Sequence, residues 1–346
     1  MKRALVISGG GSKGAFAIGI IKRLFNQFPN LEFDMFVGTS TGSLIVPLVA
    51  MKEMDLLEMI YTTQRTQDIV LKNRLGDRLN DHSIFDASPL WKLLETHYTD
   101  ERYKNVLQTG KNLFLTTTCL QSGELVVFTT DPAPAEVINY EVRSLIDANH
   151  FRKAVMASAC QPVFMPPIKV NKDVPGEPDP GFQFVDGGVR EYAGVEMAID
   201  NGATEIFTIL LSPDTKAIDH KELTDLFSIL QKTIDIFTED VGKNDLIIPD
   251  QINQALIYIE AVKRKMKGKG LSDEVIKDFF TIAGLESPLE GKMPIKFFTF
   301  RPEASLGGGP GGLTFDPAEM KGMVQKGQQS ANNFIASLNP SDITWA

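Results

Sequence analysis

Two neighbouring stretches decide the fold: ALVISGGGSKGAFAIGIIKRLF at residues 4–25 and FDMFVGTSTGSLIV at residues 33–46. Each opens with a short apolar run, residues 4–7 or 33–37, that is typical of a buried strand. Each then passes through a glycine-containing turn into apolar residues at helical spacing. Strands and helices that alternate through such short links predict a parallel sheet covered by helices on both faces.

The rest of the chain continues this alternation. Helical segments are predicted at residues 52–105, which would cross one end of the sheet, and at residues 218–285, which look like a helical insertion. We therefore expect one α/β domain over residues 1–346, in which residues 286–346 return to the core. Further strands are predicted at residues 113–118, 125–129, 182–185, 206–211 and 295–300.

Charge and composition exclude several function classes. The 346 residues carry a formal net charge of -9, which argues against nucleic acid because phosphate backbones repel an acidic protein. Two cysteines and four scattered histidines form no cluster with metal-ligand spacing. The first apolar run is too short for a signal peptide, and no apolar run reaches a membrane-spanning length. We expect a soluble, cytoplasmic protein whose membrane contact is peripheral.

The turn at residues 9–14 reads Gly-Gly-Gly-Ser-Lys-Gly and lies between the first strand and the first helix. Glycines let a backbone approach a ligand closely, and the N–H groups at the start of a helix attract negative charge. The expected ligand is therefore an anion. A pyrophosphate, a phosphate and the oxyanion of a transition state all fit such a turn.

A dinucleotide-binding enzyme is one alternative, because the turn contains Gly9-x-Gly11-x-x-Gly14 and Asp34 stands 20 residues after Gly14. In that fingerprint the acidic residue ends the second strand, where it reaches a ribose. Asp34 instead precedes the apolar residues of its strand, so its position is wrong. A Walker A loop does not fit either, because Lys13 precedes Gly14 and no Lys-Ser or Lys-Thr pair follows.

The second strand ends in a Gly-x-Ser-x-Gly sequence, residues 38–42. Gly38 and Gly42 permit a tight strand-to-helix turn that exposes the hydroxyl of Ser40 between them. A serine that only caps the following helix would give the same pattern. The glycine turn at residues 9–14 favours a nucleophile, because it predicts an anion site at the end of the neighbouring strand.

A serine nucleophile needs a base that accepts its proton, and histidine is the usual one. His82, His97 and His150 follow no predicted strand end. His220 would complete the order Ser, Asp, His that α/β-hydrolases use. It stands at the start of a charged helix, however, and such a position is typical of solvated surface.

Asp186 is the better candidate for the base. It closes the strand predicted at residues 182–185 and is followed by Gly187 and Gly188. We expect it at the carboxyl end of a parallel strand, beside Ser40, where open α/β sheets bind ligands. The alternative is that Asp186 only caps a helix, which is expected to begin at about Glu191.

Together these motifs resemble a known family. Residues 9–14, 38–42 and 186–188, in this order and spacing, resemble the three signature blocks of patatin-like phospholipases of the bacterial type. Residues 157–167 are similar to the Ala-Ser-rich, proline-ended segment that precedes the family's catalytic aspartate. The resemblance covers residues 4–210 well.

The resemblance implies a three-layer α/β/α fold and a Ser-Asp dyad, with Ser40 as nucleophile and Asp186 as base. It also implies an oxyanion hole at Gly9, Gly10, Gly11 and Ser12. No metal, cofactor or histidine would be required. The glycines that support the motifs are Gly14, Gly38, Gly42, Gly187 and Gly188.

The expected function is a lipid acyl hydrolase, a serine esterase of the phospholipase A or lysophospholipase type. A phospholipid, a lysophospholipid or another lipid ester would be the substrate, met at a membrane or lipid aggregate. Residues 163–168 and part of 218–285 are expected to flank the cleft, and Phe85 is a further candidate for its wall. A catalytically idle lipid-binding protein and the dinucleotide-binding enzyme are the two alternatives.

Overall fold

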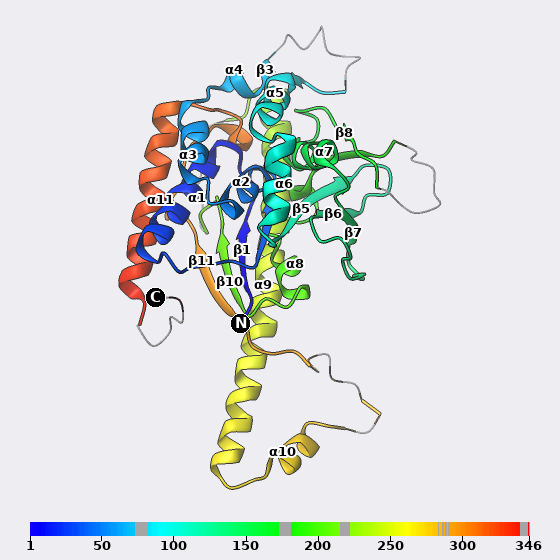
Figure 1. Cartoon of the computed structure of the whole chain (residues 1–346), viewed down its shortest axis with the longest axis vertical. Helices are drawn as coiled ribbons and strands as arrows, with labels where there is room; N and C mark the ends of the chain where they lie inside the picture. Colours follow the sequence, from blue (N-terminus) through cyan, green and yellow to red (C-terminus); the bar gives the residue numbers. More distant parts are fainter. Residues whose placement is uncertain are drawn as a thin grey trace.

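A mainly parallel sheet runs through the centre of the computed structural model, with the strand order β11-β10-β1-β2-β5-β6-β7 (Figure 1). The structure describes residues 1–72, 82–172, 181–214, 222–282, 284–285, 287, 289, 291–339 and 345. The strands of this order are β1 (Arg3–Ile7), β2 (Met35–Thr39), β5 (Asn112–Cys119), β6 (Leu125–Thr129), β7 (Glu141–Ser144), β10 (Glu205–Ile209) and β11 (Lys296–Phe300).

The five neighbouring strands from β11 to β5 are parallel, which confirms the predicted fold class. β6 is antiparallel to β5, and β7 is parallel to β6. The seven strands predicted from sequence are found within two residues of their expected bounds. β7 was not predicted, because its residues Glu141 to Ser144 are polar or charged at three of four positions and only half-buried at the sheet's edge.

Helices cover both faces of the sheet. Alternate residues of β1 enter two separate cores: Leu5 and Ile7 pack in one, Ala4 and Val6 in the other. The first core lies under α1 (Gly14–Gln27), α2 (Thr41–Ala50), α7 (Ala148–Ala159) and α11 (Pro317–Ser337). The second lies under α8 (Val195–Asp200) and part of α9 (Leu226–Gly268). The predicted three-layer α/β/α arrangement is therefore present.

Residues 52–105 are mostly helical, as predicted. α4 and the β3–β4 pair lie beyond the upper end of the sheet in Figure 1. The elements of this segment are α3 (Met54–Thr63), α4 (Thr66–Ile69), β3 (Leu71–Lys72), β4 (Phe85–Asp86), α5 (Ser88–His97) and α6 (Asp100–Gln108).

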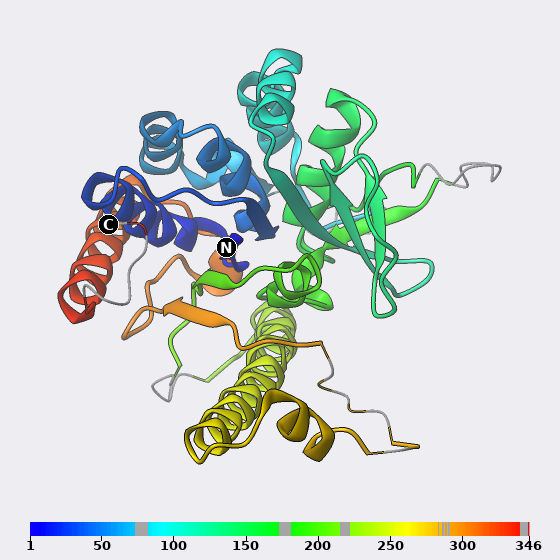
Figure 2. The ribbon, with the colours of Figure 1, turned by 60° about the horizontal axis from the view of Figure 1, so that its bottom comes forward.

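Within the region predicted to be helical at residues 218–285, the structure contains α9 and α10 (Asp273–Phe279). The first part of α9 lies beside the sheet. Its second part projects away from the body of the molecule, with α10 near its far end, as both views show (Figure 1 and Figure 2). His220 lies outside the described residues.

The direction of one strand differs from the prediction. β9 (Gln183–Asp186) is antiparallel to its neighbours β5 and β8 (Ile168–Lys169), not parallel. β5 is longer than β2, so the same edge of β5 has room for a second strand beyond the end of β2. Its first five residues pair with β2, which ends at Thr39 opposite Thr116, and its last three pair with β9, which ends at Asp186 opposite Thr117. The carboxyl ends of β2 and β9 therefore meet head to head along one edge of β5.

The C-terminal helix α11 packs along α1 at a very short distance. A Cβ atom added at Gly19 of α1 would lie 2.0 Å from the carbonyl oxygen of Val324, and one added at Gly327 of α11 would lie 2.1 Å from that of Phe16. No side chain fits at either position. The two glycines thus set the separation of the two helices.

Gly327→Ala should lower the free energy of unfolding by about 1–3 kcal/mol, because the added methyl group overpacks the contact with α1. Gly322 is the matched control on the same helix, since a Cβ there would meet no atom within 4 Å. Gly322→Ala should raise the free energy of unfolding by about 0.5–1 kcal/mol through helix propensity. Urea unfolding followed by circular dichroism measures both, and equal effects would contradict the close packing.

Candidate active site

Ser40 lies at the sharp turn between β2 and α2. Its φ of 56° and ψ of -121° are unusual for a residue with a side chain, and such strain is typical of a nucleophile elbow. A Cβ atom added at Gly38 would lie 2.6 Å from backbone atoms of Gly42. One added at Gly42 would lie 2.1 Å from the carbonyl oxygen of Ile7. Both glycines are therefore required by space. The strand-turn-helix predicted around Ser40 is confirmed.

Hydrogen bonds hold this strained turn in place. The N–H of Ser40 donates to Ser158 Oγ (3.0 Å), and Ser43 Oγ donates to the carbonyl oxygen of Ser40 (2.6 Å). Ser158 belongs to α7, in the Ala-Ser-rich segment that the sequence singled out. That segment thus fixes the backbone of the elbow and leaves the Ser40 hydroxyl outside these bonds.

Asp186 ends β9, next to the end of β2 that carries Ser40. Its N–H donates to the carbonyl oxygen of Cys160 (2.8 Å), and its Oδ1 accepts the N–H of Gly188 (2.8 Å). An added Cβ at Gly187 would lie 2.2 Å from Thr116 Oγ1, so only glycine lets the chain turn here against β5. The helix expected from about Glu191 is wrong: a 3-10 turn (Gly187–Val189) follows Asp186, and α8 begins only at Val195.

Burial changes the acidity of Asp186. The residue is 8% exposed, and removal from water raises the pKa of its carboxyl group from 3.8 to about 6. The Ser40 side chain and the N–H of Gly188 act in the opposite direction by hydrogen bonding to the charged form. A carboxylate with this pKa is a stronger base than an ordinary aspartate and is still ionised at neutral pH.

The glycine turn faces the elbow from the end of β1. An added Cβ at Gly9 would lie 3.1 Å from Ser40 Cβ, so the backbone of Gly9 and the nucleophile elbow are in direct contact. Gly11 has a φ of 57° and packs against the turn at Pro310–Gly312, where its Cβ would lie 2.2 Å from Gly312 O. Among the described residues, no acceptor binds the N–H groups of Gly10 and Gly11. These donors are therefore available to an anion.

Lys13 of this turn also lines the pocket, whereas Ser12 and Gly14 have other surroundings. Ser12 is fully buried and, unlike Gly9, Gly10 and Gly11, does not line the pocket. A Cβ at Gly14 would lie 2.8 Å from Thr41 Oγ1 and 2.8 Å from the ring of Tyr61, so Gly14 lets α1 approach α2 and α3. The hydroxyl of Tyr61 also hydrogen-bonds to Thr41 Oγ1.

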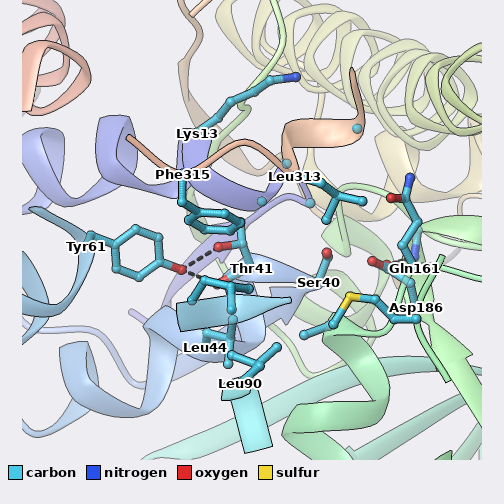
Figure 3. Close-up of a pocket in the computed structure, with 18 of the residues that line it drawn as sticks. Lys13, Ser40, Thr41, Leu44, Tyr61, Leu90, Gln161, Asp186, Leu313 and Phe315 are labelled. Atoms are coloured by element: carbon cyan, nitrogen blue, oxygen red, sulfur yellow. Dashed lines mark hydrogen bonds between the residues drawn. The ribbon is translucent and has the colours of Figure 1, made fainter. Parts of the chain in front are cut away.

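A pocket of about 200 Å³ opens beside Ser40 and Asp186, and its two walls differ in chemistry (Figure 3). The apolar wall comes mainly from α2, α3 and α5. The polar wall comes from α9, from the segment that follows α7 and from the loop that follows β10. The apolar wall includes Leu44, Leu57, Ile60, Leu90, Leu94 and Phe315, and the polar wall includes Gln161, Ser212, Asp235, Thr238 and Glu239.

Not every residue expected near the cleft lines it. Met165 does, but Val163, Phe164 and Ile168 do not, and the ring of Phe85 packs against that of Phe164 with centroids 5.8 Å apart. His97 lines the pocket although the sequence pointed away from it. Burial lowers the pKa of His97, and its main chain is held by Arg102, whose guanidinium donates to His97 O.

Two other features are absent from the described part of the chain. It contains no group of three or more His, Cys, Asp or Glu side chains that could hold a metal ion. None of its helices combines the length and the apolar character needed to cross a bilayer.

Comparison with known proteins covers the region of the pocket. The sequence profile of the family described as Patatin-like phospholipase matches residues 5–199. The cUMP-AMP-activated phospholipase of Escherichia coli is 36% identical over 64 residues, which are 17% of this chain and 20% of that protein. The match thus spans a fifth of the relative's length. The crystal structure of VipD from Legionella pneumophila aligns over 97% of this chain and 67% of its own, at 12% identity and a TM-score of 0.38.

The profile match covers more than half of the chain and contains all three glycine-rich blocks. It agrees with the region, residues 4–210, over which the sequence resembles the family. In the structure the three blocks meet at one pocket. The chain therefore belongs to the patatin-like phospholipase family, a family of lipid hydrolases.

Proposed function

We propose that this protein is a serine esterase that hydrolyses lipid esters through a dyad of Ser40 and Asp186. The observation that carries the proposal is the meeting of β2 and β9 on β5, which brings a strained serine and a buried aspartate to one pocket. Strain at the serine and a raised pKa at the aspartate are both features of reactive groups.

In the proposed reaction, Asp186 accepts the proton of Ser40 as the hydroxyl oxygen attacks the ester carbonyl. The N–H groups of Gly10 and Gly11, with that of Thr41, stabilise the negative charge on the carbonyl oxygen. A single such donor is worth about 2.7–4 kcal/mol in transition-state stabilisation. The alcohol leaves with the proton, and water activated by Asp186 then cleaves the acyl-enzyme and releases the fatty acid.

The walls of the pocket support a lipid as the substrate. The apolar wall offers an acyl chain a surface free of charge, and the polar wall lies where the rest of the lipid would remain. A phospholipid or a lysophospholipid fits this division. The protein would then bind peripherally to the lipid aggregate, and it would need no metal or cofactor.

The alternative of a dinucleotide-binding enzyme has less support. Asp34 accepts the N–H of Arg3 through Oδ2 (2.7 Å), at the beginning of β1 and β2. The glycine turn lies at the opposite end of β1, so Asp34 is far from any ligand there. A catalytically idle lipid-binding protein would share this pocket but would not hydrolyse esters. Ester hydrolysis therefore distinguishes it from the proposed esterase.

Ser40→Ala should abolish hydrolysis of short-chain nitrophenyl esters and labelling by a fluorophosphonate, because both need the hydroxyl oxygen. The fold should persist, since the hydroxyl makes no packing contact that alanine lacks. Ser122→Ala, at an exposed turn, is the control and should keep full rates. Turnover of Ser40→Ala near the control rate, at equal folding by circular dichroism, would refute the nucleophile.

The rate should depend on pH through Asp186. The base works only when it is ionised, so kcat/KM should rise with pH and reach half its plateau near pH 6, the pKa of the buried carboxyl group. An exposed aspartate would place this midpoint near its ordinary value of 3.8. The measurement uses a water-soluble ester from pH 4 to 8, and a midpoint near 4 would contradict the buried base.

A dyad and a triad differ in how two substitutions act. For a dyad, Asp186→Asn should lower the rate by about 10² or more, because the amide cannot accept the proton. His220→Ala should then change the rate little. His97→Ala should change substrate affinity but leave the catalytic rate nearly unchanged. In a triad, loss of the histidine would be as severe as loss of the aspartate. An inactive His220→Ala beside a weakly affected Asp186→Asn would replace the dyad.

A further inference from the structure

Helix α9 contacts the core with one face and exposes apolar side chains on the opposite face. On its inner face, an added Cβ at Gly242 would lie 2.5 Å from the ring of Tyr192, and Asp245 Oδ2 accepts the N–H of Tyr192 (2.7 Å). Leu256 is buried further along the helix. This face fixes α9 to the core. A surface helix that is also apolar on its outer side normally has a partner there.

The outer face carries a row of exposed apolar side chains, which we call the outer stripe. Polar residues on the same face, Thr233, Asp240, Asn244 and Gln251, separate its members. At about 100° per residue, all of its members lie within about 60° of the direction opposite to Gly242. The stripe runs about 48 Å along the helix at 1.5 Å per residue. Its members are Leu226, Ile229, Ile236, Phe237, Ile247, Ile248 and Tyr258.

Six of the seven positions in the outer stripe are symmetric about residue 242, and the counterpart of Ile229 is the exposed Ala255. Leu226 and Tyr258 each lie 16 residues from position 242, on opposite sides of it. Ile236 and Ile248 each lie six residues from it, and Phe237 and Ile247 each lie five residues from it. In an antiparallel pair of helices related by a two-fold axis level with Gly242, the members of each pair lie at the same height on opposite copies. The stripe is therefore complementary to itself, as a two-fold interface requires.

We propose that the outer stripe is a homodimer interface, in which α9 packs antiparallel against α9 of a second copy. The charges agree with this direction. Glu222 and Asp225 precede the helix, whereas Lys263, Arg264 and Lys265 lie near its end. Antiparallel packing sets the acidic end of one copy beside the basic end of the other, and parallel packing would oppose like charges. A lipid surface fits less well, because the acidic end would face its headgroups.

This interface bears on the pocket. Residues of α9 between Ile234 and Glu239 form part of the polar wall, and Ile236 and Phe237 of the outer stripe belong to the same two turns. In the dimer, the projecting half of the partner's α9 lies against the outside of these turns. The second copy thus supports one wall of the pocket from behind.

Light scattering coupled to size-exclusion chromatography tests the proposal with the full chain. The native protein should have twice the 38.2 kDa mass of one chain. Ile247→Glu should convert it to the monomer, because a charge would be buried in the interface. Ile257→Glu is the matched control, since Ile257 is 47% exposed against 49% for Ile247 but points away from the outer stripe. It should remain a dimer.

The register is tested by cross-linking between differently labelled chains. Asp240 and Asn244 lie two residues on either side of 242, so oxidation of a mixture of Asp240→Cys and Asn244→Cys chains should give mixed disulfide dimers. The native Cys119 and Cys160 are buried and do not compete. The control mixture pairs Asp240→Cys with Tyr258→Cys, whose heights differ by about 21 Å at 1.5 Å per residue. It should not cross-link.

Three results would overturn the proposal. The first is a monomer for the native protein at micromolar concentration, and the second is equal cross-linking in the two mixtures. The third is a monomeric native protein that floats with vesicles of phosphatidylcholine and phosphatidylglycerol. If Ile247→Glu then no longer floated with these vesicles and Ile257→Glu still did, the outer stripe would be a lipid-binding surface. Circular dichroism of each variant confirms that a loss of dimer is not a loss of fold.

Discussion

The site depends on one edge of β5 that two strands of opposite direction share. β2 arrives from one side and β9 from the other, and they end opposite Thr116 and Thr117. Because both strands end there, their last residues and the turns that follow are forced into one small volume. The hydroxyl of Thr116 also donates to Thr39 Oγ1 (2.8 Å), which ties the end of β2 to β5 at this point. Ser40 and Asp186 thus meet through backbone pairing, and neither needs a flexible loop to reach the other.

Rigid pairing also explains how costly features persist at the pocket. The unusual backbone of Ser40 is of a kind that costs of order 1–3 kcal/mol, and burial of the Asp186 carboxylate is unfavourable as well. Hydrogen bonds from α7 and from the turn after β9 offset part of these costs. Apolar packing in the two large cores on either side of the sheet offsets the rest of this free-energy cost. Ser40 and Asp186 are therefore held in a state that the local sequence alone would not favour.

What could be predicted from the sequence was local. The elbow at Ser40 and the glycine turn at residues 9–14 depend on a few adjacent residues, and their elements were found as predicted. The direction of β9 was wrong because it depends on pairing with β5, which lies more than 60 residues earlier. Part of residues 218–285 was expected to flank the cleft, and α9 does line the pocket. His97 and the individual lining residues of α9 were not predicted, because helical periodicity shows that a face is buried or exposed but not which cavity it lines. The roles of Ser40 and Asp186 remain predictions.

The contact between Gly11 and Gly312 has a consequence for the order of events in the cell. The two residues are 301 positions apart, and the helix that follows Gly312 packs onto the helix that follows Gly11. During synthesis the N-terminal strands emerge first and can pair early, but the support of the glycine turn is made only after residue 312 has emerged. A ribosome-bound fragment therefore lacks a finished anion site. The proposed activity therefore requires that residues as distant in the sequence as 11 and 312 have both left the ribosome.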